Sequence, residues 1–437
     1  MSGMPLSRIR VLDLSLIWAG PNAVMMLGDL GAEIVRIEST QHHITNTRGF
    51  VPRPSKETVQ KLGYVGSLYA DLDPKDAPWN RHAMFNSLGR NKYSMTVDLT
   101  KPEGCQIVQD LVKVSDVLVE NQSVGLLRRF GLDYESVRAL NPTLVYLTLP
   151  IYGLSGPYSD YMGFGAQGEA MAGVLSLRGY RNSDPTTAGI ANHMDATTGV
   201  AAAYAAMLGL MERDQTGGGQ LIEFSQVEHL IQQIGGPLMD AVMNNRAQTP
   251  LGNRDPVRAP QGVYRCKDED RSDDRWIVLT VGADDEWTGL CTAIGRPELI
   301  EDPRFEDMFV RSANHDELDK IIEEWSTQQD PRLAAELLQQ HGVPAGMVAQ
   351  DFDVLEDPHL DARGFFHQID HPEAGRHRYP GHTYRLSKTP LRFDSPAPLL
   401  GEQNDYVYRG LLGFGEADIQ RLTETGHIGT AYADHVR

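Results

Sequence analysis

The chain has 437 residues, which is more than one hydrophobic core usually organises, so two domains are expected and three are not excluded. Its 59 acidic residues outnumber its 40 basic ones, and the resulting formal charge of −19 disfavours nucleic acids and anionic membranes as partners. No long apolar run or secretory leader is seen, and three widely spaced cysteines fit a reducing compartment, so a cytoplasmic location is expected.

The predicted elements begin with a strand over residues 9–14, a helix over 22–30 and a second strand over 32–38. Pro21 lies near the start of the helix and Gly31 ends it. A strand, a helix and a strand within about thirty residues predict a βαβ unit with parallel strands.

The pattern recurs along the first 150 residues, with strands over 93–99, 117–120 and 144–149 and a helix over 102–114. This repetition predicts an open α/β sheet, and ligands of such sheets lie at the carboxyl ends of the strands. The segments expected at that edge are 15–21, 38–40, 120–123 and 150–153.

Later segments differ in character. Residues 41–82 contain little periodicity and predict a long loop, which is either functional or a surface excursion. A packed helix over 195–211 and a strand over 220–224 follow. A more charged stretch from 225 to 335, with an isolated strand over 276–281, predicts a second, smaller domain.

Motifs for two other kinds of site are missing. The sequence has no CxxC pair and no HExxH motif, so it gives no support for a metal site. No GxGxxG opens the first strand-to-helix turn, which disfavours a dinucleotide-dependent oxidoreductase.

Short motifs in a fixed order resemble the class III (CaiB/BaiF-type) coenzyme A transferases, a family that includes formyl-CoA transferase and the α-methylacyl-CoA racemases. The motifs are RVLDLS at 10–15, AGP at 19–21, LGAE at 30–33, GRNK at 89–92, DVLVEN at 116–121, TGGGQ at 216–220, HGVPAG at 341–346 and PLLGE at 398–402. No single motif is decisive, but their order covers nearly the whole chain.

The resemblance implies an α/β fold with a large Rossmann-like domain, a smaller α+β domain and an interlocked homodimer. Residues 1–224 would form the large domain with the coenzyme A site and the nucleophile, and 225–335 the small domain. Residues 336–437 would return to complete the large domain.

The resemblance also implies that Asp195 is the catalytic nucleophile. A carboxylate can attack an acyl-CoA carbonyl, give a mixed anhydride, and then carry coenzyme A as an aspartyl thioester. From the residues alone, Asp195 could equally cap the alanine-rich helix that follows it.

The family pattern also assigns a set of coenzyme A contacts, with coenzyme A as substrate and no metal. These are Ile17, Trp18, Ala19, Arg90, Lys92, Asn121, Gln122, Arg129 and Phe130. Arginine suits phosphate because it can bind it in a bidentate way. The alternatives are a core position for Trp18 and a solvated helix end for Arg129.

Three further residues are candidates for the substrate pocket. Glu169 either orients Asp195 or binds an acid, or else lies at the surface near a helix start. His193 is either a loop histidine or a pocket residue, and the backbone near Gly252 or Gly262 is a candidate oxyanion donor.

The sequence also departs from the family pattern. Ser39 stands where some transferases have an arginine, and a glycine tetrad used as a lid is absent from 245–262. A histidine–aspartate pair of the racemases is absent near 164–166, which ranks proton transfer below CoA transfer. An intramolecular acyl-CoA isomerase and a non-catalytic CoA-binding subunit remain as alternatives.

Overall fold

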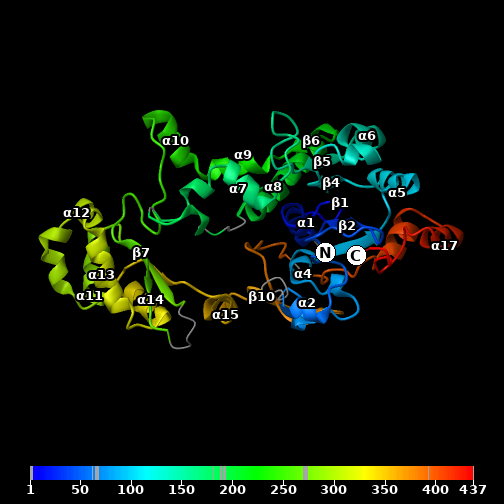
Figure 1. The fold of residues 1–437 in the computed structure, drawn as a ribbon. Helices are drawn as coiled ribbons and strands as arrows, with labels where there is room; N and C mark the ends of the chain where they lie inside the picture. Colours follow the sequence, from blue (N-terminus) through cyan, green and yellow to red (C-terminus); the bar gives the residue numbers. More distant parts are fainter. Residues whose placement is uncertain are drawn as a thin grey trace. The chain divides into compact units, whose positions relative to one another are not determined.

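The computed structural model describes residues 3–61, 63, 68–180, 182–187, 189, 193–268, 274–391 and 393–436. The chain folds into two compact units. The first comprises Met1–Val174, Ile190–Gly235 and Gly364–Arg437, and the second comprises Leu175–Gly189 and Gly236–Arg363. Both ends of the chain therefore belong to the first unit, where the blue and red segments of Figure 1 lie.

A parallel sheet organises the first unit. Its strands are β1 (Arg10–Asp13), β2 (Glu33–Glu38), β3 (Lys92–Thr96), β4 (Val117–Glu120), β5 (Val145–Thr148) and β6 (Leu221–Glu223), and they lie in the order β3-β2-β1-β4-β5-β6. Every neighbouring pair is parallel. The predicted α/β sheet is confirmed, and its strand order reverses between β1 and β4.

Alternating side chains of the strands divide the core into two layers, since successive residues of a strand point to opposite faces. On one face, Val11 and Val117 pack with α1 (Ala19–Asp29) and α8 (His193–Thr216). On the other, Leu12 and Leu118 pack with α5 (Pro102–Val112), α6 (Tyr134–Leu140) and the C-terminal segment that holds α17 (Glu416–Glu424). The described residues of this unit also form α2 (Lys56–Lys61), α4 (Ala83–Leu88), α7 (Gly165–Met171) and α9 (Gln226–Gln233).

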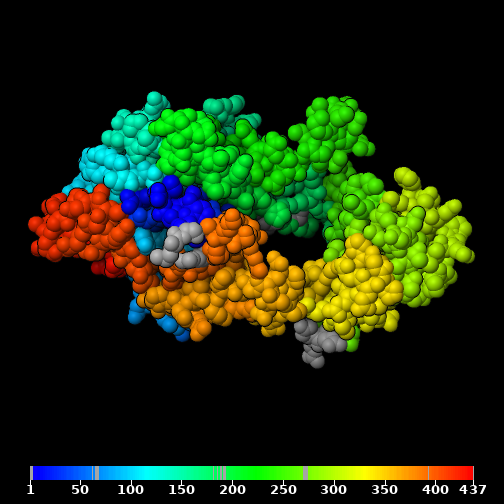
Figure 2. All heavy atoms as spheres, turned by 180° about the vertical axis from the view of Figure 1, so that it is seen from behind, coloured from blue at the N-terminus to red at the C-terminus, as the bar shows by residue number. Residues whose placement is uncertain are grey.

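The C-terminal segment also covers the free edge of β3. The Ser94 N–H donates to the Gln403 side-chain oxygen at 2.8 Å, and the Thr96 N–H donates to that of Asn404 at 2.8 Å. These side chains take the place of a further strand, because backbone donors at a sheet edge need partners. Figure 2 shows orange C-terminal atoms against the blue N-terminal ones. The hairpin of β10 (Phe366–His371) and β11 (Gly375–Pro380) lies in the same unit.

The second unit contains an antiparallel sheet of β7 (Gln261–Arg265), β8 (Trp276–Thr280) and β9 (Ala345–Met347). The α-helices in its described residues are α10 (Gly235–Asn244), which begins at the unit boundary, α11 (Asp284–Ala293), α12 (Met308–Ala313), α13 (His315–Ser326), α14 (Pro331–Gln340), α15 (Asp351–Leu355) and α16 (Pro358–Ala362). Because β9 pairs with β8, residues 336–363 belong to this unit and not to the C-terminal segment in which the sequence-based division placed them.

None of the helices in the described part of the chain is long and apolar enough to cross a membrane. The long segment 41–82 is mostly loop, with α2 and two short 3₁₀ helices in its described residues. It is tied to the C-terminal segment by Arg48, whose guanidinium group donates to the Pro398 carbonyl at 3.1 Å.

Candidate active site

The edge at which β1 and β4 end forms the centre of the candidate site. In open parallel sheets with this strand order, ligands bind where the order reverses. Two residues after β4 hold the loop after β1. The Asn121 side chain accepts from the Leu16 N–H at 2.6 Å and donates to the Leu16 carbonyl at 2.9 Å, while Gln122 donates to the Leu14 carbonyl at 2.8 Å.

This loop has an unusual backbone at Ile17, which adopts a φ of 65°. A β-branched residue in the left-handed region is strained, and such strain often occurs at functional sites. Trp18 precedes α1, and Ala19 is its first residue, fully buried. A Cβ on Gly20 would lie 2.3 Å from the Ser15 Cβ, so the loop and α1 approach too closely for any other residue there.

Asp195 lies in the first turn of α8, so it is inside the helix and not at the preceding cap position. Helix α8 packs closely on α1. Asn22 of α1 donates to the Ala196 carbonyl at 3.1 Å, and a Cβ on Gly199 would lie 2.5 Å from the Asn22 Nδ2. The amino-terminal ends of both helices therefore meet at Asp195, where helix dipoles favour negative charge.

The surroundings of Asp195 raise its pKa to about 6. Burial is the main cause, because it disfavours the charged carboxylate, and the nearby carboxylate of Glu169 acts in the same direction. A hydrogen bond from the Ala19 backbone opposes both effects. The result is a carboxylate more basic than an ordinary aspartate that is still largely ionised at neutral pH.

Glu169 and His193 are two of the residues that the sequence predicts for the substrate pocket. Glu169 comes from α7, is fully buried, and accepts from the Met194 N–H at 3.4 Å. His193 is the exposed first residue of α8. Glu169 thus lies beside Asp195, whereas the role of either residue toward a substrate stays a prediction.

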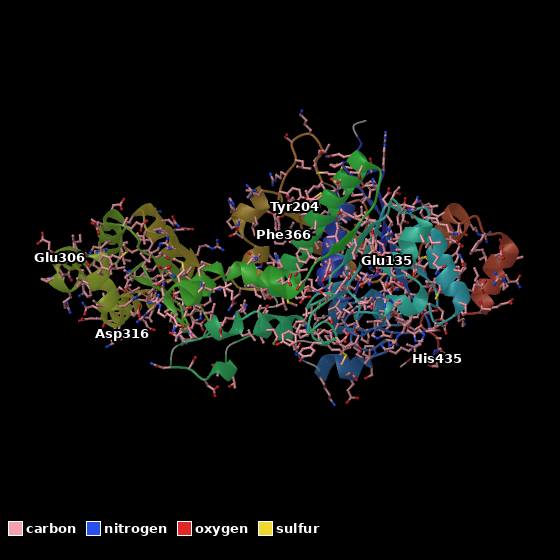
Figure 3. The ribbon with its side chains drawn as sticks, turned by 90° about the horizontal axis from the view of Figure 1, so that it is seen from above. Glu135, Tyr204, Glu306, Asp316, Phe366 and His435 are labelled. Atoms are coloured by element: carbon pink, nitrogen blue, oxygen red, sulfur yellow. The ribbon has the colours of Figure 1, made fainter. Side chains whose placement is uncertain are left out.

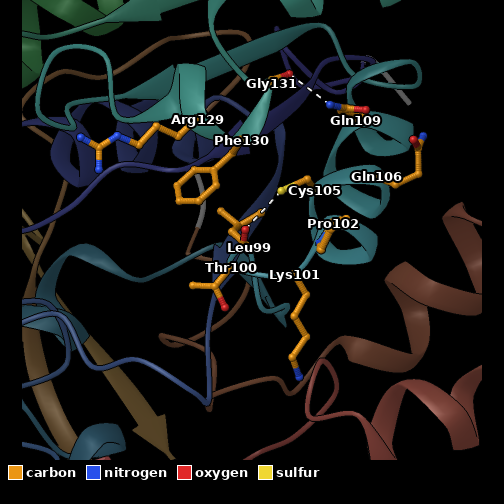
Figure 4. Close-up of a pocket in the computed structure, with 10 residues that line it drawn as sticks. All are labelled: Leu99, Thr100, Lys101, Pro102, Cys105, Gln106, Gln109, Arg129, Phe130 and Gly131. Carbon is orange, nitrogen blue, oxygen red and sulfur yellow. Dashed lines mark hydrogen bonds between the residues drawn. The ribbon is translucent and has the colours of Figure 1, made fainter.

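Arg129 and Phe130 line an open pocket of about 400 Å³ between α5 and the 3₁₀ helix Leu127–Phe130 (Figure 4). Its other lining residues are Leu99, Thr100, Lys101, Pro102, Cys105, Gln106, Gln109 and Gly131. The sequence did not single out Lys101 as a binding residue. A signal was nevertheless present, because Lys101 follows the third strand of the sheet at the expected ligand edge.

Arg90 and Lys92 are both buried and paired within the protein. Arg90 donates to both carboxylate oxygens of Asp29, at 2.9 Å and 2.6 Å, and stacks on Phe393. The Lys92 Nζ donates to Asp13 at 3.2 Å and to the Pro21 carbonyl at 3.0 Å. The cavity beside Lys92 measures about 10 Å³, which is room for about one water molecule. Direct contact of either residue with coenzyme A stays a prediction.

Gly252 belongs to the second unit and adopts a φ of 64°. Its N–H donates to the Gly179 carbonyl at 3.0 Å, and a Cβ there would lie 2.4 Å from the Tyr180 ring. Gly262 lies in β7 of the same unit. The proposed oxyanion role of these backbone groups stays a prediction.

A parallel sheet with a reversal of strand order, and an aspartate of raised pKa near the edge where ligands of such sheets bind, are features found in many α/β enzymes. The model of CoA-transferase family III matches residues 6–404. The chain therefore belongs to CoA-transferase family III, and it is an enzyme of that class.

Proteins named as CoA-transferases are similar to this chain over most of their length. The succinyl-CoA–D-citramalate CoA-transferase of Chloroflexus aurantiacus is 32% identical over 96% of this chain and 96% of its own. The succinate–glutarate CoA-transferase of Agrobacterium fabrum is 31% identical over 92% of this chain and 94% of its own. A crystal structure of a CaiB/BaiF family protein from Brucella suis superposes with a TM-score of 0.78 at 29% identity, covering 94% of this chain and 100% of that one.

Proposed function

We propose that the protein transfers coenzyme A from an acyl-CoA to a carboxylic acid, with Asp195 as the nucleophile. The observation that carries this proposal is the position of Asp195 in the first turn of α8, with a pKa of about 6 and a hydrogen bond from the Ala19 backbone. A nucleophilic carboxylate should be ionised yet as basic as its working pH allows, and this environment provides both conditions.

The reaction divides into four steps. The Asp195 carboxylate attacks the thioester carbonyl carbon, the C–S bond breaks, and the CoA thiolate leaves a mixed anhydride. The thiolate then attacks the Asp195 carboxyl carbon, releases the donor acid and gives an aspartyl-CoA thioester. The acceptor carboxylate displaces the thiolate from that carbon, and the thiolate finally attacks the acceptor acyl carbon and frees Asp195. Atoms and electrons balance without a further reagent.

The open pocket at Arg129 suits the nucleotide end of coenzyme A. Arg129 is exposed on its rim, and Lys101 adds a second cation, which matters because the chain as a whole is acidic and repels phosphate. Phe130 and Leu99 provide apolar surface for an adenine ring. Arg129→Ala should raise the KM for acyl-CoA by about tenfold, as one charge-assisted contact would. A KM within twofold of the wild-type value would argue against this pocket.

The names of the relatives support a dicarboxylic substrate. Those named here act on succinyl-CoA with D-citramalate and on succinate with glutarate, and another relative is named a formyl-CoA:oxalate CoA-transferase. We therefore propose succinyl-CoA or a similar dicarboxylic acyl-CoA as donor and a short dicarboxylate as acceptor.

Mass spectrometry of the protein mixed with acyl-CoA tests the role of Asp195. The wild type should gain one coenzyme A with loss of water, hydroxylamine should remove it, and peptide mapping should place it on Asp195. Asp195→Ala should show neither the adduct nor exchange between succinyl-CoA and a labelled acid. Full exchange of coenzyme A by the Asp195→Ala variant would contradict the proposed role of Asp195. Exchange of an α-deuterium without movement of coenzyme A would favour the racemase reaction.

A homodimer is the assembly we propose. One face of α8 exposes a row of large apolar side chains at Val200, Tyr204, Leu208 and Met211, each 45–59% exposed. An apolar row of this kind usually meets a partner, and the resemblance suggests a second copy.

A cytoplasmic location is also proposed. All three cysteines, which the structure describes, are free thiols, in keeping with that location.

A further inference from the structure

Three charged side chains lie together beneath the loop after β1. Asp13, Arg36 and Lys92 come from the adjacent strands β1, β2 and β3, and none is more than 3% exposed. The Asp13 Oδ2 accepts from Arg36 at 3.0 Å and from Lys92 at 3.2 Å. Burial alone would raise the pKa of Asp13, but the two cations and Ser15 outweigh it and hold the pKa at about 2.

This triad holds the loop through its backbone. The Asp13 Oδ1 accepts from the Ser15 N–H at 3.0 Å and also from the Ser15 hydroxyl. Arg36 donates to the Ser15 carbonyl at 3.3 Å, and Lys92 donates to the Pro21 carbonyl at 3.0 Å, in the first turn of α1. These hydrogen bonds therefore fix the loop at its start, at Ser15, and beyond its end, at Pro21.

The segment between these two ends carries the features that face the nucleophile. Ile17 adopts its left-handed backbone there, and Ala19 directs its N–H to Asp195. A strained conformation persists only where the surroundings impose it. Asp13, Arg36 and Lys92, together with Asn121 directly after β4, supply that constraint.

We propose that Lys92 and Arg36 are positioning residues for the reaction, acting through Asp13 and Pro21 on the loop that presents Ala19 to Asp195. This inference rests on the proposed function of Asp195. It assigns Lys92 a role inside the protein in place of a phosphate contact. Buried ion pairs contribute little net stability compared with well-packed apolar groups, so a positioning role gives a reason for three charges at this place.

Lys92→Met tests the inference. It leaves the Arg36 and Arg48 guanidinium groups facing the Asp13 and Glu38 carboxylates, so the remaining charges stay paired. We expect kcat to fall about tenfold to a hundredfold while the KM for acyl-CoA changes less than about threefold, as misplacement of a reacting group predicts. Arg81→Met is the matched control, since Arg81 is equally buried but donates to the Asp73 and Ala70 carbonyls and pairs with the exposed Asp71 carboxylate. Its kcat should stay within twofold of wild type.

Hydrogen–deuterium exchange of peptides covering residues 14–22 provides a readout that does not depend on activity. These peptides should exchange faster in Lys92→Met and not in Arg81→Met. Ser15→Ala, a milder change, should act in the same direction if Lys92→Met does not fold. Unchanged exchange overturns the positioning role even if Asp195 proves to be the nucleophile. A raised KM with unchanged kcat overturns it as well, since that result indicates direct contact with coenzyme A. Faster exchange together with an active Asp195→Ala variant would refute the proposed function and leave the loop support intact.

Discussion

The environment of Asp195 has opposite effects on the basicity of its carboxylate and on the stability of the folded protein. Its partly buried carboxylate is made more basic by burial and by Glu169, and the same environment makes the folded protein less stable when the carboxylate is charged. The folded-state pKa of about 6 lies above the ordinary value of 3.8. The unfolded chain therefore releases this proton at lower pH than the folded one, so this residue's contribution to stability declines as the pH rises from about 4 to about 6.

Asp195→Asn removes this penalty while retaining an oxygen that accepts from Ala19. A shift of this size corresponds to at most about 3 kcal/mol, and partial exposure reduces the expected gain in the free energy of unfolding to about 1 kcal/mol at pH 7.5. The gain should shrink at pH 5, where the folded carboxyl is largely protonated. Urea unfolding of both proteins at the two pH values measures it. An equal gain at both would show that the carboxylate charge is not the cause.

Glu169→Gln tests the electrostatic link between the two carboxyl groups. The amide oxygen of glutamine can still accept from the Met194 N–H, while the negative charge that raises the pKa of Asp195 is lost. The plot of kcat/KM against pH should rise near pH 6 in the wild type, and in Glu169→Gln this ascending limb should move to lower pH by less than about one unit. Glu135→Gln, at an exposed side chain labelled in Figure 3, is the control and should leave the limb in place. A limb that does not move in Glu169→Gln contradicts the link.

At the scale of elements, the close packing of α1 on α8 sets the distance between Ala19 and Asp195. Gly199→Ala would place a Cβ 2.5 Å from the Asn22 Nδ2 and 2.7 Å from the Asn22 Cβ, which is fixed to the α1 backbone, so one helix must shift. We expect a loss of about 1–3 kcal/mol in stability and a fall in kcat of at least tenfold. Thermal unfolding and steady-state kinetics measure the two effects. Gly218→Ala, where the added Cβ meets only Thr216 at 3.9 Å, is the control. Wild-type kcat in Gly199→Ala would show that this distance is not critical.

Local patterns in the sequence predicted the elements well, because apolar β-branched runs and helix-ending glycines act over a few residues. The fourth strand was predicted with its observed bounds, Val117–Glu120. Local patterns could not predict the hydrogen bonds by which residues distant in the sequence hold the loop after β1. Asn121 lies 105 residues from the Leu16 backbone that it holds, and Lys92 lies 79 residues from Asp13. A buried lysine and an exposed phosphate-binding lysine look alike in a sequence.

At the scale of the whole molecule, the exposed row on α8 predicts how the chain assembles. Tyr204, labelled in Figure 3, is 59% exposed at the middle of that row. Tyr204→Glu combined with Leu208→Glu should convert a dimer into a monomer, because charges cannot be buried there without partners. Sedimentation velocity measures the change. Glu substitutions at exposed Val114 and Leu140, which are not part of α8, are the control and should leave the dimer intact.

The covered edge of β3 has a consequence for synthesis of the chain. Ser94 and Thr96 are made early, but Gln403 and Asn404, which satisfy their backbone donors, emerge from the ribosome about three hundred residues later. During that interval the nascent sheet presents an open strand that another chain can join. A product terminated before residue 403 would keep this edge open permanently. Premature termination and slow translation near the end of the message should therefore lead to aggregation.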